Sequence, residues 1–285
     1  MGIKENDYFP LAAGPVTLGI KFDVPENKDV FAGYFTGYAG TGGIDLYLDF
    51  TIVGHTDLPD IPVSLVQAKR WRGDEFVIGD DLFSGRFDQQ HRRWNVKVKN
   101  IMTKGQMTRV FEQFLYQAFF SACGQARKEA ILLHSSGVSV GSRGFLFVGA
   151  SGMGKSTVAE LSKEYGVIND EINILSPDPE GFRLHRSPFN SYFSPKNGAA
   201  APLKAVFLLA HADSCRLERV SPAQAVAEIT GQVVPPLGLE HPFSPAVANR
   251  MMAAALTLAN TVPVYRLHFP VQGGFWPLIL ELFPQ

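Results

Sequence analysis

Residues 149–157 of this chain read Gly149-Ala150-Ser151-Gly152-Met153-Gly154-Lys155-Ser156-Thr157. The stretch fits the pattern G-x-x-x-x-G-K-[ST] of a phosphate-binding loop at every fixed position. The apolar run 144–148 before it predicts a buried strand, and residues 156–165, which end at Gly166, predict a helix. Such a loop needs strand, loop and helix in this order. The stretch therefore predicts a site for the phosphates of a nucleotide.

Each fixed residue of the loop has a physical role in that prediction. The glycines let the backbone turn tightly and expose successive amide N–H groups, which form an anion site with the positive end of the helix. Lys155 would reach the β and γ phosphates of ATP, and the Ser156 hydroxyl would ligate Mg²⁺. The expected nucleotide-binding residues are Gly149, Ser151, Gly152, Met153, Gly154, Lys155, Ser156 and Thr157.

Composition narrows the class of protein. The 285 residues are 46% hydrophobic, and 26 basic against 27 acidic residues leave a formal net charge of −1, so we expect no binding of nucleic acid. Cys123 and Cys215 have no metal-like spacing and suit reduced thiols in the cytoplasm. The N-terminus lacks the apolar core of an export signal, and the longest apolar stretch, 251–259, is too short to cross a membrane.

The first half of the chain has strand-like patterns. Apolar and polar residues alternate in 16–22 and 44–50, and the runs 63–66, 75–78 and 94–99 follow between Gly, Pro and Asp turns. These patterns predict an antiparallel sheet.

A change of period marks the end of this half. Apolar residues recur every three or four positions in 107–123, which predicts an amphipathic helix that stops at Gly124. We therefore expect a β-rich domain with a connecting helix over residues 1–125 and a phosphate-loop domain over 126–285.

The second half places polar residues around the loop. Residues 130–140 and the strand before the loop predict a hairpin, and Asp170 and Glu171 interrupt an apolar strand over 167–175. Residues 190–201 form a polar loop long enough to act as a lid. The remaining predicted elements are strands at 182–185, 203–209, 215–220 and 262–269, and helices at 221–230, with a capping box, 244–259 and 274–283.

The two acids predict catalysis or metal binding. A carboxylate within hydrogen-bond reach of a hydroxyl can take its proton as a phosphoryl group moves, and we assign that role to Asp170. Glu171 would lie on the opposite face of a regular strand, so it could ligate Mg²⁺ only if the chain bends there. Two alternatives remain open, that Asp170 itself ligates the metal ion and that the acids form structural salt bridges.

His134, the loop and the acid pair follow one another in an order and spacing that resemble the catalytic domain of HPr kinase/phosphorylase, over roughly residues 130–175. Leu133-His134, Ser187-Pro188-Phe189 and residues 203–207 make the wider chain similar to HPr-kinase-related proteins that accompany some peptide-modification clusters. The resemblance implies an α/β domain like those of HPr kinase and phosphoenolpyruvate carboxykinase, in a chain that is α+β overall. It also implies Mg²⁺-dependent transfer from ATP to a serine hydroxyl of a peptide or protein, with His134 beside the phosphates.

The chain departs from that family in three places. It has Asp170-Glu171 where the family has two aspartates, and residues 176–285 lack a Glu-Val-Arg-Gly-Leu-Gly-type segment, so we expect no phosphorolysis. The first half also shows no match to the N-terminal domain of that enzyme, so we do not expect HPr as the substrate. Ser187 and Asn190 could contact substrate or only shape a turn. His185, His211 and His241 are expected to be structural or exposed.

Two other functions stay open at this point. The same site could phosphorylate a small metabolite, as in the distantly similar ATP-dependent phosphoenolpyruvate carboxykinases, or nucleotide binding could switch the binding of a partner without catalysis. The chain has no Leu-Ser-Gly-Gly-Gln or Asn-Lys-x-Asp segment, which argues against a transporter ATPase and a small GTPase. Assembly into a homo-oligomer is left open.

Overall fold

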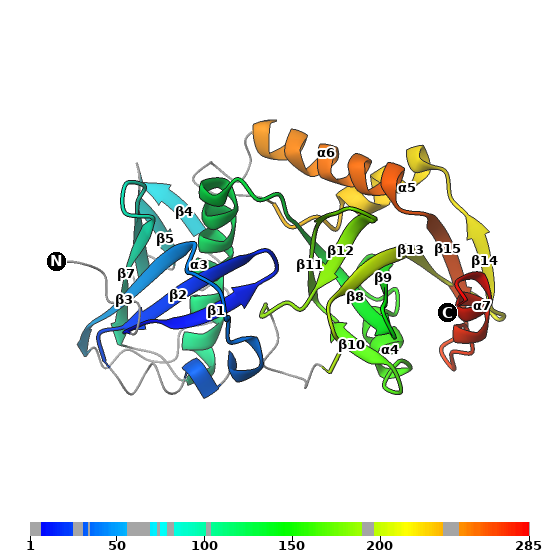
Figure 1. Ribbon diagram of the computed structural model, residues 1–285, viewed down its shortest axis with the longest axis horizontal. Helices are drawn as coiled ribbons and strands as arrows, with labels where there is room; N and C mark the ends of the chain where they lie inside the picture. Colours follow the sequence, from blue (N-terminus) through cyan, green and yellow to red (C-terminus); the bar gives the residue numbers. More distant parts are fainter. Residues whose placement is uncertain are drawn as a thin grey trace. The chain divides into compact units, whose positions relative to one another are not determined.

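Two groups of strands, each with its own helices, make up the chain (Figure 1). The computed structural model describes residues 7–24, 31–33, 35–55, 69–72, 75–78, 83–100, 104–189, 197–235 and 245–284. These residues form two compact units, one that reaches to Lys128 and one that begins at Glu129. The predicted strand at 63–66 and the predicted lid residues 190–196 lie outside the described ranges.

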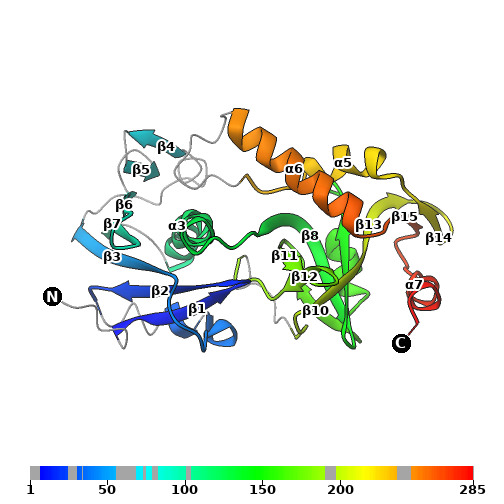
Figure 2. The ribbon, with the colours of Figure 1, turned by 45° about the horizontal axis from the view of Figure 1, so that its top comes forward.

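The described part of the first unit is a seven-stranded sheet with the order β1-β2-β3-β7-β6-β5-β4. Helix α3 packs on β2 and β3 (Figure 2). Its Phe114 packs edge-on against Phe50 and Trp94, and the Trp94 indole donates to the Ser121 hydroxyl at 3.2 Å. The elements are β1 (Phe9–Ala13), β2 (Val16–Phe22), β3 (Leu46–His55), β4 (Lys69–Arg72), β5 (Glu75–Ile78), β6 (Phe83–Asp88), β7 (Arg93–Asn100), the 3₁₀ helix η2 (Thr36–Tyr38) and α3 (Lys104–Ala126).

The expectation of a purely antiparallel sheet in this unit is wrong. Strand β3 runs parallel to both of its neighbours, β2 and β7, while the other pairs are antiparallel. Parallel neighbours need a long connection, and more than twenty residues separate the end of β2 at Phe22 from the start of β3 at Leu46. Alternation along a strand reports which face is buried, but it carries no information on the direction of the neighbouring strand.

Helix α3 is longer than its apolar pattern predicts. It passes through Gly124, which is exposed and does not end the helix. The end comes instead at Arg127, whose φ of 52° is left-handed, and the Lys128 amide donates back to the Cys123 carbonyl at 2.9 Å.

The second unit is built on a sheet with the order β10-β8-β11-β12-β13-β15-β14, in which β9 also pairs with β8 and β13. Because β8, β11, β12, β13 and β9 pair in turn and β9 pairs back with β8, these strands close into a ring. The strands are β8 (Ile131–Val140), β9 (Arg143–Val148), β10 (Gly166–Asn169), β11 (Ile172–Asp178), β12 (Gly181–His185), β13 (Ala201–His211), β14 (Arg216–Arg219) and β15 (Val264–Phe269). The predicted hairpin before the loop is confirmed as β8 and β9.

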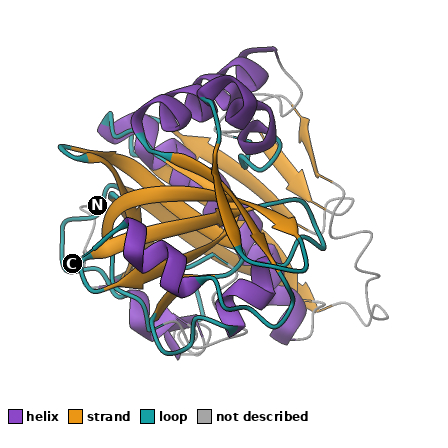
Figure 3. Ribbon diagram, turned by 90° about the vertical axis from the view of Figure 1, so that its right-hand side faces the viewer, coloured by secondary structure: helices purple, strands orange, loops and turns teal. Residues whose placement is uncertain are grey.

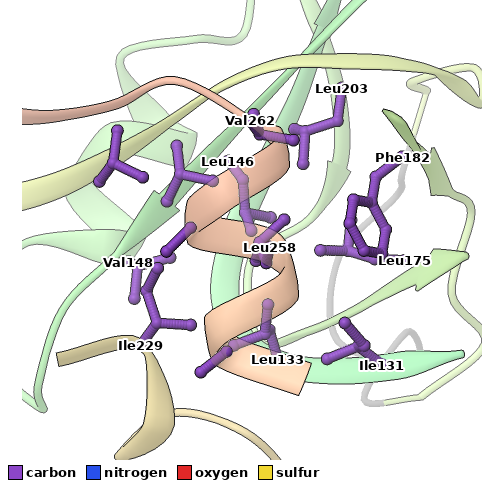
Figure 4. Packing of buried hydrophobic residues seen from close by; sticks show 14 of the residues in the cluster. Ile131, Leu133, Leu146, Val148, Leu175, Phe182, Leu203, Ile229, Leu258 and Val262 are labelled. Carbon is purple, nitrogen blue, oxygen red and sulfur yellow. The ribbon is translucent and has the colours of Figure 1, made fainter. Parts of the chain in front are cut away.

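Helices cover two sides of these strands (Figure 3). One apolar cluster joins the strands to α5 and α6, with Ile229 and Leu258 among strand residues such as Leu146 (Figure 4). A second cluster joins the opposite side to α4 and α7 through Val158 and Trp276. The helices are α4 (Lys155–Glu160), α5 (Pro222–Thr230), α6 (Pro245–Thr261) and α7 (Trp276–Leu282).

The predicted capping box at the start of α5 is confirmed, with Ser221 and Gln224 bonding reciprocally. Within the described ranges, no helix has both the length and the apolar character needed to span a bilayer.

Candidate active site

Strand direction brings the predicted site residues to one edge of the second sheet. Strands β9 and β13 run parallel, so their carboxyl ends, Val148 and His211, meet at the same edge, which is where ligands bind in open parallel sheets. Strand β8 runs antiparallel to β9, with Ser135 opposite Val148, and Ile172 of β11 lies opposite His134. The start of the loop, His134 and the acid pair are therefore neighbours.

The loop has the backbone that its glycines predict. Gly152 and Gly154 have φ angles of +83° and +96°, a region that residues with a side chain rarely adopt. A Cβ on Gly154 would also lie 3.0 Å from the ring of Phe269. The side chains of Ser151 and Ser156 are exposed, and Met153 and Thr157 are partly exposed.

The helix after the loop is shorter than predicted. Regular α-helix extends only from Lys155 to Glu160, and residues 161–164 continue as turns. The Ser162 and Tyr165 amides donate to carbonyls three residues back, at 3.2 and 2.9 Å, so the chain tightens before it enters β10. The Ser162 hydroxyl accepts from the indole of Trp276, which anchors this turn to α7.

Lys155 lies at the base of the loop. Its side chain is largely buried, and its ammonium donates to the carbonyls of Gly149 at 2.7 Å and Ala150 at 3.2 Å. Burial lowers the pKa of Lys155, and the negative charge of Glu171 opposes that shift. The loop cation and Glu171 are thus close enough to interact electrostatically.

The acid pair lies in a bend and not in a regular strand. The predicted strand 167–175 is interrupted, because β10 ends at Asn169 and β11 begins at Ile172. A carboxylate oxygen of Glu171 lies 2.9 Å from Nε2 of His134, and both side chains are partly exposed. Glu171 was expected to be able to ligate Mg²⁺ only if the chain bends at this point, and the chain does bend there. Asp170 lies in the same bend and is partly buried.

His211 is a residue of this edge that the sequence prediction missed. Its Nε2 donates to the carbonyl of Gly152 at 3.1 Å, and its ring lies beside that of Phe269, with centroids 6.1 Å apart. His211 is exposed, as expected, but its contact with the loop was not expected. Only the parallel pairing of β13 with β9 indicates it, because the two residues are 59 positions apart.

Three other residues were named from the sequence. Asn190 and His241 lie outside the described ranges. Ser187 is fully buried, and its hydroxyl accepts from the Phe189 amide at 3.3 Å, which is the turn-shaping role.

A cavity of about 530 Å³ lies elsewhere in this unit. Its lining includes Arg219, Ser221, Asn260 and Val264, which surround the amino end of β15. The loop lies at the carboxyl end of the parallel strands, so this cavity is not part of the candidate site.

Residues 99–283 match the model of the family described as SynChlorMet cassette protein ScmC. The match covers more than half of the chain, including the loop, His134 and both acids. The chain belongs to the ScmC family.

Other comparisons are more distant. No curated protein matches this ScmC-family chain in sequence. Among solved structures, the Hpr(Ser) kinase/phosphatase from Coxiella burnetii is similar to 53% of this chain and 91% of its own, with 12% identity and a TM-score of 0.27. A functional interpretation has to be built on the geometry of the loop and its neighbours.

Three residues around the loop carry side-chain oxygens of the kind that ligate Mg²⁺. Among the described residues, no three or more His, Cys, Asp or Glu side chains cluster as a metal site. Mg²⁺ needs no such cluster, because it is usually held by one or two protein oxygens together with substrate phosphates and water. Ser156, Asp170 and Glu171 are the oxygen donors that this part of the ScmC-family fold offers.

Proposed function

We propose that this chain is an ATP-dependent, Mg²⁺-requiring kinase that phosphorylates a serine hydroxyl of a peptide or small protein. One observation carries the proposal: Glu171 lies 2.9 Å from His134 on β8, and β8 pairs with both β9, which leads into the phosphate loop, and β11, which follows the acids. A loop of this kind holds polyphosphate, and an acid next to it is what transfer to a hydroxyl requires.

The loop residues bind and orient the nucleotide in this proposal. The amides of residues 150–156 surround the β and γ phosphates, and Lys155 exchanges its contacts with the Gly149 and Ala150 carbonyls for phosphate oxygens. Ser156 and Glu171 would hold Mg²⁺, which would supply positive charge against the phosphate oxygens when bound. Burial lowers the pKa of Lys155, and the negative charge of Glu171 opposes that shift.

The two acids have separate roles. Asp170 accepts the proton of the serine hydroxyl while the serine oxygen bonds to the γ-phosphorus and the bond between that phosphorus and ADP breaks. Glu171 is oriented by His134 and acts toward the metal ion. A phosphoserine and ADP are the products, and the proton leaves through Asp170.

The test is transfer of label from γ-labelled ATP to a library of serine-containing peptides. Asp170→Asn should lower transfer by about 10²- to 10⁴-fold, the range for loss of a general base, with little change in ATP affinity. Lys155→Met should lower ATP affinity and transfer together. Glu180→Gln is the matched control, since Glu180 is an exposed acid of the same unit that pairs with Lys204.

Other outcomes would redirect the proposal. Transfer that survives Asp170→Asn would remove that residue as the base. ADP release that depends on a small hydroxylated metabolite would change the acceptor class. ATP binding without transfer or hydrolysis would contradict catalysis and favour a nucleotide-dependent binding protein.

A further inference from the structure

Asn169, the last residue of β10, lies directly before the acid pair and has no exposed surface. A buried carboxamide needs partners for its oxygen and its nitrogen, since an unpaired group would cost roughly 1–3 kcal/mol. The identity of these partners indicates what Asn169 does.

The carboxamide oxygen of Asn169 holds the bend that contains the acids. It accepts from the backbone amide of Glu171 at 2.8 Å and from that of Ile172 at 3.0 Å. A side chain that binds the amide two residues ahead forms an Asx turn, which sets the course of the backbone between them. The path of the chain through Asp170 and Glu171 is therefore set by Asn169.

The carboxamide nitrogen of the same residue holds a second segment. It donates to the carbonyl of Ser187 at 3.2 Å and to that of Phe189 at 2.8 Å. Backbone N–H groups surround the side-chain oxygen of Asn169, and backbone carbonyls surround its side-chain nitrogen. Only one orientation of the carboxamide therefore satisfies all four bonds. Asn169 thus ties the segment 187–189 to the acidic bend.

A second buried asparagine supports this bend from the other side. The side-chain nitrogen of Asn173 donates to the backbone carbonyl of Ser135 at 2.7 Å and to that of Asn169 at 3.2 Å. The backbone amide of Ser135 donates to the backbone carbonyl of Glu171 at 3.0 Å. The Glu171 backbone is consequently held at its N–H by Asn169 and at its C=O by β8. Its side chain is left to reach His134.

We infer that Asn169 is a positioning residue, which holds Asp170 and Glu171 in a bend beside the phosphate loop and couples that bend to the segment 187–189. The catalytic part of this inference rests on the proposed kinase function, because it acts through the acids. The structural part does not, because the four hydrogen bonds exist without any substrate.

Two variants separate the two halves of the network. Asn169→Ser loses the N–H donors to the Ser187 and Phe189 carbonyls, and its shorter hydroxyl can replace the bonds to the Glu171 and Ile172 amides only weakly. It should therefore release the segment 187–189 and loosen the bend. Asn169→Asp keeps oxygen acceptors for the Glu171 and Ile172 amides but loses both N–H donors. It should therefore keep the bend and release the segment.

Hydrogen exchange of single amides, followed by NMR, tests the structural half without any activity. In Asn169→Ser the Glu171 and Ile172 amides should exchange at least tenfold faster than in the wild type, and in Asn169→Asp they should stay protected. Unchanged exchange of both amides in the serine variant would overturn the inference, whatever the enzyme does.

Transfer kinetics in the full-length chain test the catalytic half. Asn169→Ser should lower kcat by about 10- to 100-fold with ATP affinity unchanged, and its effect should shrink in a Glu171→Gln background because both changes act through one acid. Gln117→Ser is the matched control, as Gln117 is also a buried carboxamide but belongs to helix α3 of the first unit, outside the acidic bend and its hydrogen-bond partners. It should lower stability while it retains most of kcat.

Two results would count against this half. Equal losses of kcat in the two serine variants, in proportion to their loss of stability, would show that Asn169 has only a structural role. Absence of transfer in the wild type, with the amide exchange as expected, would refute the kinase proposal and leave the positioning of the bend established.

Discussion

Residues of the candidate site contact partners that are distant in the sequence. Glu171 contacts His134, 37 positions earlier, and His211 contacts the Gly152 carbonyl of the loop. Neither contact could be predicted from neighbouring residues, since each depends on strand pairing. At the residue scale, the site consists of short polar contacts that join strand residues to the acidic bend and to the loop.

His185 provides a stability prediction at this scale. Burial lowers the pKa of His185 to about 4, with the charge of Arg183 adding to the shift and that of Asp178 opposing it. Above pH 6.5 both folded and unfolded chains hold a neutral imidazole. As the pH falls from 6.5 toward 4 the unfolded chain takes up a proton that the folded chain refuses, so the free energy of unfolding should fall by about 3 kcal/mol.

Urea unfolding at pH 7 and pH 4.5 measures this effect. His185→Gln removes the titrating group and can keep a hydrogen bond with Ser176, whose hydroxyl lies 2.8 Å from Nε2 of His185. The variant should lose much less stability than the wild type between the two pH values. If the free energy of unfolding of the variant fell as much as that of the wild type, the pH dependence would belong to other groups.

Whole elements show where local sequence patterns and tertiary demands conflict. The apolar pattern of 167–175 predicts one strand, and the structure divides it into β10 and β11, both paired with β8. The break comes at Asp170 and Glu171, where the side chain of Asn169 replaces ladder bonds. The polar residues within the apolar run thus coincide with the break between the two strands, while periodicity could not reveal the bend.

Substitution of glycine by alanine should have opposite effects on stability in β8 and in α3. A Cβ on Gly137 of β8 would lie 2.2 Å from the Asn173 side-chain oxygen and 3.3 Å from Leu184, so Gly137→Ala should destabilise the protein by about 1–3 kcal/mol. Gly124 of α3 has open space around it, so Gly124→Ala should stabilise the protein by up to about 1 kcal/mol.

Chemical denaturation of the two alanine variants checks both signs. The Gly124 variant serves as control, because the substitution is the same and only the surroundings differ. A stable Gly137→Ala protein would mean that Asn173 can move without loss of its bonds to Ser135.

At the scale of the whole molecule, nucleotide binding should appear as stability. A ligand that binds only the folded state at 100 times its Kd adds about 2.7 kcal/mol to the free energy of unfolding. ATP with Mg²⁺ should therefore raise the midpoint of thermal unfolding by several degrees in scanning calorimetry. The effect should disappear in Lys155→Met, since the loop loses its cation.

Lys163→Met is the matched control for this measurement. Lys163 is an exposed lysine shortly after α4, paired with Glu160, and it lies outside the loop. Its substitution should leave the ATP-dependent shift intact. Equal shifts in both variants would place nucleotide binding away from Lys155.

The sequence by itself determined the phosphate loop, the strand before it, the capped helix α5 and the concentration of polar residues at 134 and 169–171. These features are local, because glycine spacing, apolar alternation and a capping box act between residues a few positions apart. Tertiary structure alone decided the parallel course of β3, the early end of α4, the bend at the acids and the contacts of Glu171 and His211. Those features depend on which strands pair and in which direction, and this is settled by the burial of side chains far apart in the chain.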